Sequence, residues 1–230
     1  MSGDTGAADQ PWNHRLYLPA YRYSEVARFA RTFAATVRRW YRGYGVPGHH
    51  MEPVLPTGHE NLLSYIQLVE TVFVVNFRRA GVKLDALRHA HDYLRATFAY
   101  EYPFAQLKLR TDGKNVLAET LPESEFWLII ANQNGQLMWK EAVREQFEQF
   151  DYDDGLALRW RPRGRDNVVL IDPRVAFGTP VIENTGVPTY VIKERFAAGE
   201  SIDDIRDDYG ISLRQIEQAL DFEGVRTTAA

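Results

Sequence analysis

The chain has 230 residues, 45% of them hydrophobic, and no cysteine. This length allows one large hydrophobic core or two of ordinary size. The lack of cysteine excludes disulfides, thiolate zinc sites and cysteine nucleophiles, and it agrees with a reducing compartment. No run of apolar residues is long enough to span a membrane, and the first residues have neither the basic start nor the apolar core of a secretion signal. We therefore expect a cytoplasmic protein with no membrane partner.

Charge is distributed unevenly along the chain, whose formal net charge is −4. Residues 1–110 contain 14 lysines and arginines against 9 aspartates and glutamates. Residues 111–165 contain 7 against 10, and residues 166–230 contain 6 against 12. The basic surplus lies in the N-terminal half, so a phosphate backbone would be attracted to that half first.

The N-terminal region predicts a helix, a turn and a second helix. Ser24 can cap a helix over 24–30 whose apolar residues share a face, and a turn follows at Arg31-Thr32. The second helix covers 33–41. The next segment, 42–58, contains four glycines and three prolines, which favours a short ribbon or wing over a helix.

The middle of the chain predicts further helices and a hairpin. Residues 62–79 have apolar residues on more than one side at helical spacing, so we expect a largely buried helix, and 84–98 form another. Alternation around an Asp-Gly turn predicts a hairpin over 106–117. Residues 126–130 fit a buried strand or a short helix equally well, and 138–150 carry a helical stripe.

A predicted strand over 156–160 is expected to pair with a buried strand over 168–171. We place a domain boundary inside this hairpin, which gives domains 1–165 and 166–230.

Three short helices complete the C-terminal domain. Ser201 and Ser212 are suited to cap the second and third helices, and Gly210 makes a tight turn between them. Helices joined this closely are the layout that positions a recognition helix for a DNA groove. The expected fold is mainly α with small β-hairpins (α+β), and it contains two helix-turn-helix or winged-helix-like domains per chain.

Six arginines within twenty-one residues, opposed only by Glu25, mark the N-terminal helix pair. A guanidinium group matches both phosphates and guanine edges. A solvated helix face is the alternative explanation for such a charge run. The candidate DNA-binding residues are Arg31, Thr36, Arg38, Arg39, Tyr41 and Arg42 here, and Arg214 and Gln215 on the last helix.

The segments Tyr23-Ser-Glu-Val-Ala27, Thr36-Val-Arg-Arg-Trp40 and Arg78-Arg-Ala-Gly-Val82 resemble the MerR-like winged helix-turn-helix. The resemblance implies that Ala27 lets two helices approach closely and that residues 36–38 lie on a recognition helix. One departure concerns the turn, which is usually Gly-Val in that family and is Arg31-Thr32 here.

The segments Asp172-Pro-Arg174, Phe177-Gly-Thr-Pro180 and Ala198-Gly-Glu-Ser-Ile202 resemble the small domain of unknown function found in VapB-like antitoxins. The resemblance covers nearly the whole chain, but an arginine usual in the family is missing from Asn184-Thr-Gly-Val-Pro188. It implies a bacterial, nucleoid-associated homodimer that binds a palindromic operator, represses its own operon and neutralises a PIN-domain ribonuclease toxin. The C-terminal domain would then read DNA, or serve dimerisation or toxin binding.

Alternating arginines form a second basic feature just before the domain boundary. In an extended segment, a period of two projects them to one side, which suits the carboxylate cluster that the resemblance implies for a PIN toxin. A solvated hairpin tip is the alternative. The candidate toxin-binding residues are Arg159, Arg161, Arg163 and Arg165.

No motif for catalysis, phosphate binding or metal binding stands out. Residues 151–155 resemble the start of a calcium loop, but the required Glu is replaced by Pro162. His89 and His91 are two residues apart on a predicted helix and face different ways. We expect no enzyme, catalytic residue, metal or cofactor. The alternatives are a solitary MerR-like transcription regulator without a toxin, and a nucleic-acid-processing enzyme or its scaffold.

Overall fold

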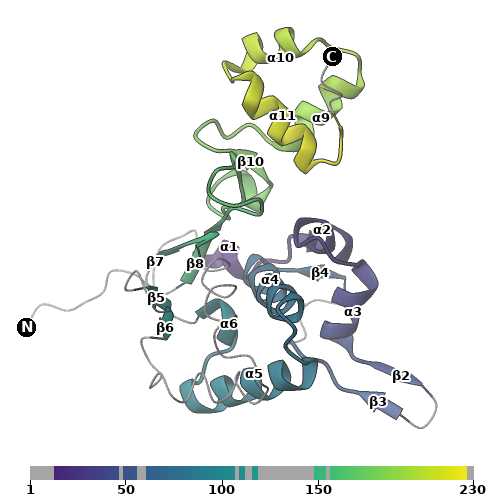
Figure 1. Cartoon of the computed structure of the whole chain (residues 1–230), viewed down its shortest axis with the longest axis vertical. Helices are drawn as coiled ribbons and strands as arrows, with labels where there is room; N and C mark the ends of the chain where they lie inside the picture. Colours follow the sequence, from purple (N-terminus) through teal and green to yellow (C-terminus); the bar gives the residue numbers. More distant parts are fainter. Residues whose placement is uncertain are drawn as a thin grey trace, which may run out of the picture. The chain divides into compact units, whose positions relative to one another are not determined.

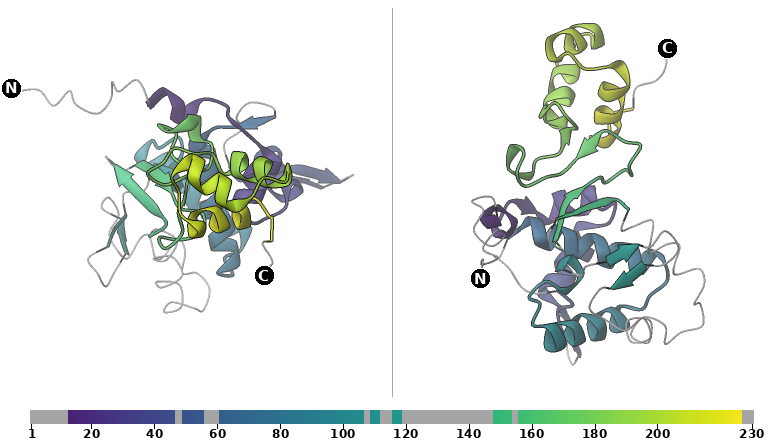
Figure 2. Two further views of the ribbon diagram at one scale, coloured as in Figure 1. Left: turned by 90° about the horizontal axis from the view of Figure 1, so that it is seen from above. Right: turned by 90° about the vertical axis from the view of Figure 1, so that its left-hand side faces the viewer.

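The computed structural model describes residues 13–46, 49–55, 61–106, 109–111, 116–118, 148–153 and 156–226. It divides into two compact units, Met1–Ala157 and Leu158–Ala230, here called the N-terminal and C-terminal units (Figures 1 and 2). The predicted element at 126–130 and nearly all of the predicted helix at 138–150 lie outside the described residues. The last residue of that predicted helix, Phe150, belongs to a strand.

The architecture is a mixture of helices and small two-stranded sheets. The N-terminal unit contains α1 (Asn13–Tyr17), β1 (Tyr21–Arg22), α2 (Tyr23–Phe29), α3 (Ala34–Arg42), β2 (Tyr44–Val46), β3 (His49–Met51), β4 (Leu62–Leu63), α4 (Tyr65–Arg79), α5 (Leu84–Phe98), α6 (Pro103–Gln106), β5 (Leu109–Thr111), β6 (Val116–Ala118) and β7 (Phe150–Asp153). The strand β8 (Leu156–Trp160) spans the boundary between the units. The C-terminal unit continues with β9 (Val169–Leu170), η1 (Ala176–Gly178), β10 (Val181–Ile182), α9 (Thr189–Ala197), α10 (Ile202–Tyr209) and α11 (Leu213–Phe222).

The core of the N-terminal unit is organised around α4, which is buried along most of its length. In Figure 1, α4 lies between the α2–α3 pair and α5. The helix begins at Ser64, whose backbone N–H donates to the Gln67 side chain at 2.9 Å in a capping box. The predicted buried helix at 62–79 corresponds to α4 and the predicted helix at 84–98 to α5, so both predictions are confirmed. So is the hairpin near 106–117, where β5 and β6 pair from Thr111 opposite Val116.

The helices α2 and α3 are joined by a tight turn at the predicted place. Thr32 closes the turn by donating its N–H to the Ala27 carbonyl at 2.8 Å, and Arg31 has a positive φ of 54°. The predicted cap at Ser24 is wrong, because α2 begins one residue earlier. Glu25 instead accepts a hydrogen bond from the backbone N–H of Arg22 at 2.8 Å.

Tyr41 fastens α3 to α4. Its side chain is 1% exposed, and its hydroxyl donates to the Gln67 carbonyl at 2.7 Å and lies 3.0 Å from the Thr71 hydroxyl. Burial raises the pKa of Tyr41 well above its ordinary value. The prediction that Tyr41 contacts DNA is therefore wrong, since the residue belongs to the core.

The C-terminal unit packs three helices around an isoleucine-rich core. Ser201 accepts from the Asp204 N–H at 3.1 Å and Ser212 from the Gln215 N–H at 3.3 Å, so both predicted caps are present. Gly210 ends α10 in the left-handed conformation, as expected for a tight turn. The buried cluster consists of Ile182, Ile192, Ile205, Ile211, Ile216, Ala219 and Leu220.

The strands near the boundary pair differently from the prediction. β8 pairs with β7, and β9 pairs with β10 with Val181 opposite Leu170. The predicted pairing of 156–160 with 168–171 survives only as one bridge between Trp160 and Ile171, with two hydrogen bonds of 2.9 Å. Consecutive turns after Trp160 limit the pairing. The units divide after Ala157, a few residues before the predicted boundary.

A buried carboxylate organises the loop that follows β9. Asp172 is 1% exposed and accepts hydrogen bonds from the backbone and side chain of Arg174, at 2.8 to 3.2 Å, and from Arg159 at 3.0 Å. Burial alone would raise the pKa of Asp172, but the bonds and charge of these arginines outweigh burial and hold it below its ordinary value.

We expect Tyr41→Phe to lower the free energy of unfolding by about 1–2 kcal/mol, because a buried carbonyl and a buried hydroxyl lose a partner. Urea unfolding followed by circular dichroism measures the difference. Tyr44→Phe is the matched control, since Tyr44 is 45% exposed. Equal losses in both variants would contradict the role assigned to Tyr41.

We expect Asp172→Asn to lower the free energy of unfolding at neutral pH by about 1–3 kcal/mol. A depressed pKa stabilises the fold above the ordinary carboxyl range, and this stabilisation is lost as pH falls through the lower folded-state pKa. Below about pH 4, the free energy of unfolding of the wild-type protein should therefore fall more steeply with pH than that of the variant. If the free energies of unfolding of the wild type and the variant, measured with urea, change with pH in parallel, the role assigned to Asp172 is refuted.

Candidate nucleic-acid interface

The exposed face of α3 is basic. Its buried residues are Val37, Trp40 and Tyr41, and helical periodicity therefore turns the intervening arginines outward. Arg38, Arg39 and Arg42 are all exposed, and Thr36 is half-buried in the first turn of the helix. The predicted cationic face of the second helix is thus present.

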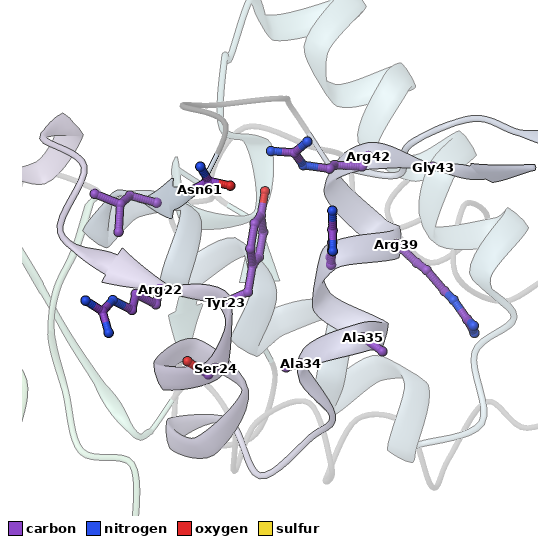
Figure 3. Close-up of a pocket in the computed structure, with 11 residues that line it drawn as sticks. Arg22, Tyr23, Ser24, Ala34, Ala35, Arg39, Arg42, Gly43 and Asn61 are labelled. Atoms are coloured by element: carbon purple, nitrogen blue, oxygen red, sulfur yellow. The ribbon is translucent and has the colours of Figure 1, made fainter.

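A concave surface of about 830 Å³ lies beside this face (Figure 3). Polar and small side chains from three segments line it. In Figure 3, Tyr23 extends from the start of α2 alongside α3 and toward Asn61, while Arg39 points away on the opposite side of α3. The lining residues are Arg22, Tyr23, Ser24, Ala34, Ala35, Arg38, Arg39, Arg42, Gly43, Asn61 and Leu62.

Sequence reasoning missed Ser24 and Asn61 as members of this surface. Asn61 lies just before β4, and the pairing of β1 with β4 brings it beside α2. No local pattern signals that approach. Arg22 is not among the predicted DNA contacts, although it lies on β1 at the edge of the same groove.

Three arginines of this region carry charge that the fold does not neutralise. Within the described part of the chain, the guanidinium groups of Arg31, Arg38 and Arg42 meet neither a carboxylate nor a hydrogen-bond acceptor. An unneutralised cluster raises the local positive potential and attracts an anionic ligand. The side chains of Ala34 and Ala35, which line the same concave surface, are small and leave room for a broad ligand.

A β-hairpin adjoins the same helix. β2 and β3 pair with Tyr44 opposite Met51, and Figures 1 and 2 show the hairpin extending away from the helices of its unit. The Arg39 guanidinium lies 5.4 Å from the centre of the Tyr44 ring, within cation–π range. The predicted ribbon is therefore present and contacts the basic helix.

The C-terminal unit uses its arginines differently. Arg195 pairs with Glu200 and with Asp208, and Arg206 pairs with Asp203 at 2.6 Å. Arg214 donates to the Asp166 carbonyl at 2.9 Å, and the Gln215 side chain accepts from the Ser212 N–H at 2.8 Å. The two candidate readers on α11 are thus held by contacts within their own unit.

The alternating arginines do not form the predicted extended strip. β8 ends at Trp160, and the chain then turns, with Gly164 donating its N–H to the Arg161 carbonyl at 3.0 Å. Arg159 pairs with Asp172, Arg161 pairs with Glu183 at 2.5 Å, and Arg163 lies 4.9 Å from the Phe222 ring centre. Arg165 is exposed. The four residues therefore do not share one face.

Among the described residues, no group of three or more histidine and acidic side chains is arranged to hold a metal ion. None of the described helices combines the length and apolar character needed to cross a membrane.

Comparisons with known proteins place these features in a family. The model of a protein family of unknown function (DUF433) matches residues 169–222. The Mycobacterium tuberculosis protein named "Putative antitoxin VapB45" is 30% identical over 94% of this chain and 98% of its own length. The uncharacterized protein Rv2308 of the same organism is 27% identical over 94% of both chains.

A solved structure agrees with the fold. The crystal structure of Rv2018 from Mycobacterium tuberculosis superposes with a TM-score of 0.66 at 30% sequence identity, covering 89% of this chain and 98% of that one. Because the similarity to the curated relative extends over nearly the full length of both proteins at 30% identity, the chain belongs to the VapB45 family of antitoxin-like proteins.

Proposed function

We propose that the N-terminal unit binds double-stranded DNA as a MerR-like winged helix-turn-helix. In this proposal α3 is the recognition helix and the β2–β3 hairpin is the wing. The observation that carries it is the set of open arginines on the outward face of α3, beside a groove of suitable size. Cations of this kind contact phosphates and guanine edges, while the small Ala34 and Ala35 allow close approach to a duplex.

The distribution of ion pairs supports placing DNA binding in the N-terminal unit. The arginines of the C-terminal unit are matched with carboxylates or carbonyls, as at Arg195, Arg206 and Arg214. Because these side chains already have partners within their own unit, fewer of their N–H donors are open to a phosphate. The C-terminal unit therefore serves another purpose in our proposal, toxin binding or dimerisation.

We further propose that the protein is an antitoxin. The name of its relative supports a toxin partner in general, and the partner class that we propose is a PIN-domain ribonuclease. As a homodimer, the protein would bind a two-fold symmetric operator and repress its own operon. It would work in the bacterial cytoplasm, at the nucleoid, without a cofactor and without catalysing a reaction.

A solitary MerR-like regulator is the second candidate, and it is favoured by the winged shape of the basic region, which needs no toxin. The two candidates differ in whether the neighbouring gene product binds this chain. A nucleic-acid-processing enzyme would instead cleave DNA or RNA in pure form when magnesium is added.

Replacing Arg38 and Arg39 with alanine should weaken binding to the DNA upstream of the protein's own gene. Each lost contact costs about 1–3 kcal/mol, and the slope of affinity against salt falls by about one per phosphate contact. Fluorescence anisotropy titrations at several salt concentrations, with footprinting of the protected site, measure both effects.

The matched control is the double variant Lys193→Ala and Arg206→Ala. It removes the same charge from exposed positions of the C-terminal unit. If this control weakens binding as much as the α3 variant does, net charge alone sets the affinity and α3 is not the reader.

The product of the neighbouring reading frame should co-purify with this chain when the two are expressed together. Arg163→Ser with Arg165→Ser should reduce the amount captured, whereas Arg159 and Arg161 are left unchanged because they pair with acids of their own unit. Lys193→Ser serves as the control. Undiminished capture by the double variant would remove these arginines from the toxin contact, and no capture by the wild-type chain would favour the solitary regulator.

A further inference from the structure

The turn between α2 and α3 contains a strained arginine. Arg31 has a φ of 54°, in the left-handed region that is unfavourable for any residue with a Cβ atom outside asparagine and aspartate. Glycine adopts this region without strain. The turn therefore places an arginine in a conformation that glycine would adopt without strain.

A second arginine, Arg79 on α4, contacts the same turn. Arg79, in the last turn of α4, donates from one nitrogen, Nη2, to the Ala30 carbonyl at 3.1 Å and to the Arg31 carbonyl at 2.6 Å. A guanidinium group has five N–H donors. The donors on Nε and Nη1 of Arg79 meet no acceptor within the described residues.

The Arg79 guanidinium reaches the backbone carbonyl of Arg31, and the charges of the two residues act on one another. Partial burial lowers the pKa of Arg79, and the charge of Arg31 lowers it further. Both residues are exposed, and within the described ranges no carboxylate pairs with either guanidinium. Two like charges next to a strained turn destabilise the free protein, and an anion bound between them would relieve the repulsion.

We propose that Arg31 and Arg79 form a phosphate-binding corner that takes one phosphodiester group of the DNA backbone. The inference rests on the proposed DNA binding and adds a contact from the turn and from the end of α4. The Arg31 side chain is exposed at this turn. Arg79 supplies the second guanidinium while holding the turn in place. A contact of this kind carries no sequence information, and it fixes how the recognition helix is positioned on the duplex.

The test separates stability from binding. Arg31→Gly should raise the melting temperature by about 1–4 °C, because the strain is removed. The same variant should bind duplex DNA about 5- to 10-fold more weakly, with a salt slope lower by about one. Arg31→Asn tolerates the left-handed conformation without the charge, so it should also bind weakly. Arg31→Lys keeps both the charge and the strain and should retain wild-type stability and most of the binding.

The probes are calf thymus DNA and the duplex upstream of the protein's own gene, since a phosphate contact affects both. Arg95→Ala is the matched control because it removes one exposed cation from α5, which lies away from α2 in Figures 1 and 2. If wild-type protein binds DNA and Arg31→Gly binds equally well, the corner is not a phosphate site. If Arg31→Gly melts at a lower temperature than wild type, the strain argument is overturned. Failure of the wild-type protein to bind either duplex would instead refute the proposed function.

Discussion

The orientation of α3 depends on one buried hydroxyl. Tyr41 reaches from α3 to the Gln67 carbonyl and the Thr71 side chain on α4. A buried carbonyl that loses a hydrogen-bond partner costs free energy. The bond from Tyr41 therefore favours one rotation of α3 about its axis. That rotation turns Arg38 and Arg42 outward. A residue of the core thus determines which side chains are available at the surface.

The arginines of the two units differ in their partners. In the N-terminal unit the basic side chains around α3 are left without acidic partners among the described residues, whereas in the C-terminal unit Arg159, Arg161 and Arg195 meet carboxylates. Exposed pairs contribute little to stability, but the buried Asp172 needs its arginines to remain ionised. Arginine in the C-terminal unit is therefore largely a component of the fold.

Most of the longer helices could be predicted from local chemistry. Ser201, Ser212 and Gly210 mark their ends because capping and left-handed termination depend on residues only a few positions apart. The helix pair near Arg31 was also predicted from apolar spacing and composition. These signals are confined to a single turn of chain, so no tertiary information is needed to use them.

Apart from the cap at Ser24, the errors came from contacts between distant residues. Tyr41 stands beside exposed arginines in sequence, and nothing local shows that its hydroxyl bonds to α4, 26 residues away. The alternating arginines appeared to share a face because an extended strand was assumed, whereas turns follow Trp160 and the acids that receive Arg159 and Arg161 are 13 and 22 residues distant. The groove lining at Asn61 likewise depends on strand pairing between β1 and β4.

The open arginines would also affect how fast the protein meets the anionic ligand that we propose. A concentrated positive potential on the α2–α3 side pulls polyanions toward that side before any contact forms, and it can raise association rates by about 10-fold or more at low ionic strength. Because α5 lies on another side of the unit (Figure 1), approach is biased in direction as well as in rate. If α3 is the recognition helix that we propose, productive collisions would begin with this helix already facing the duplex.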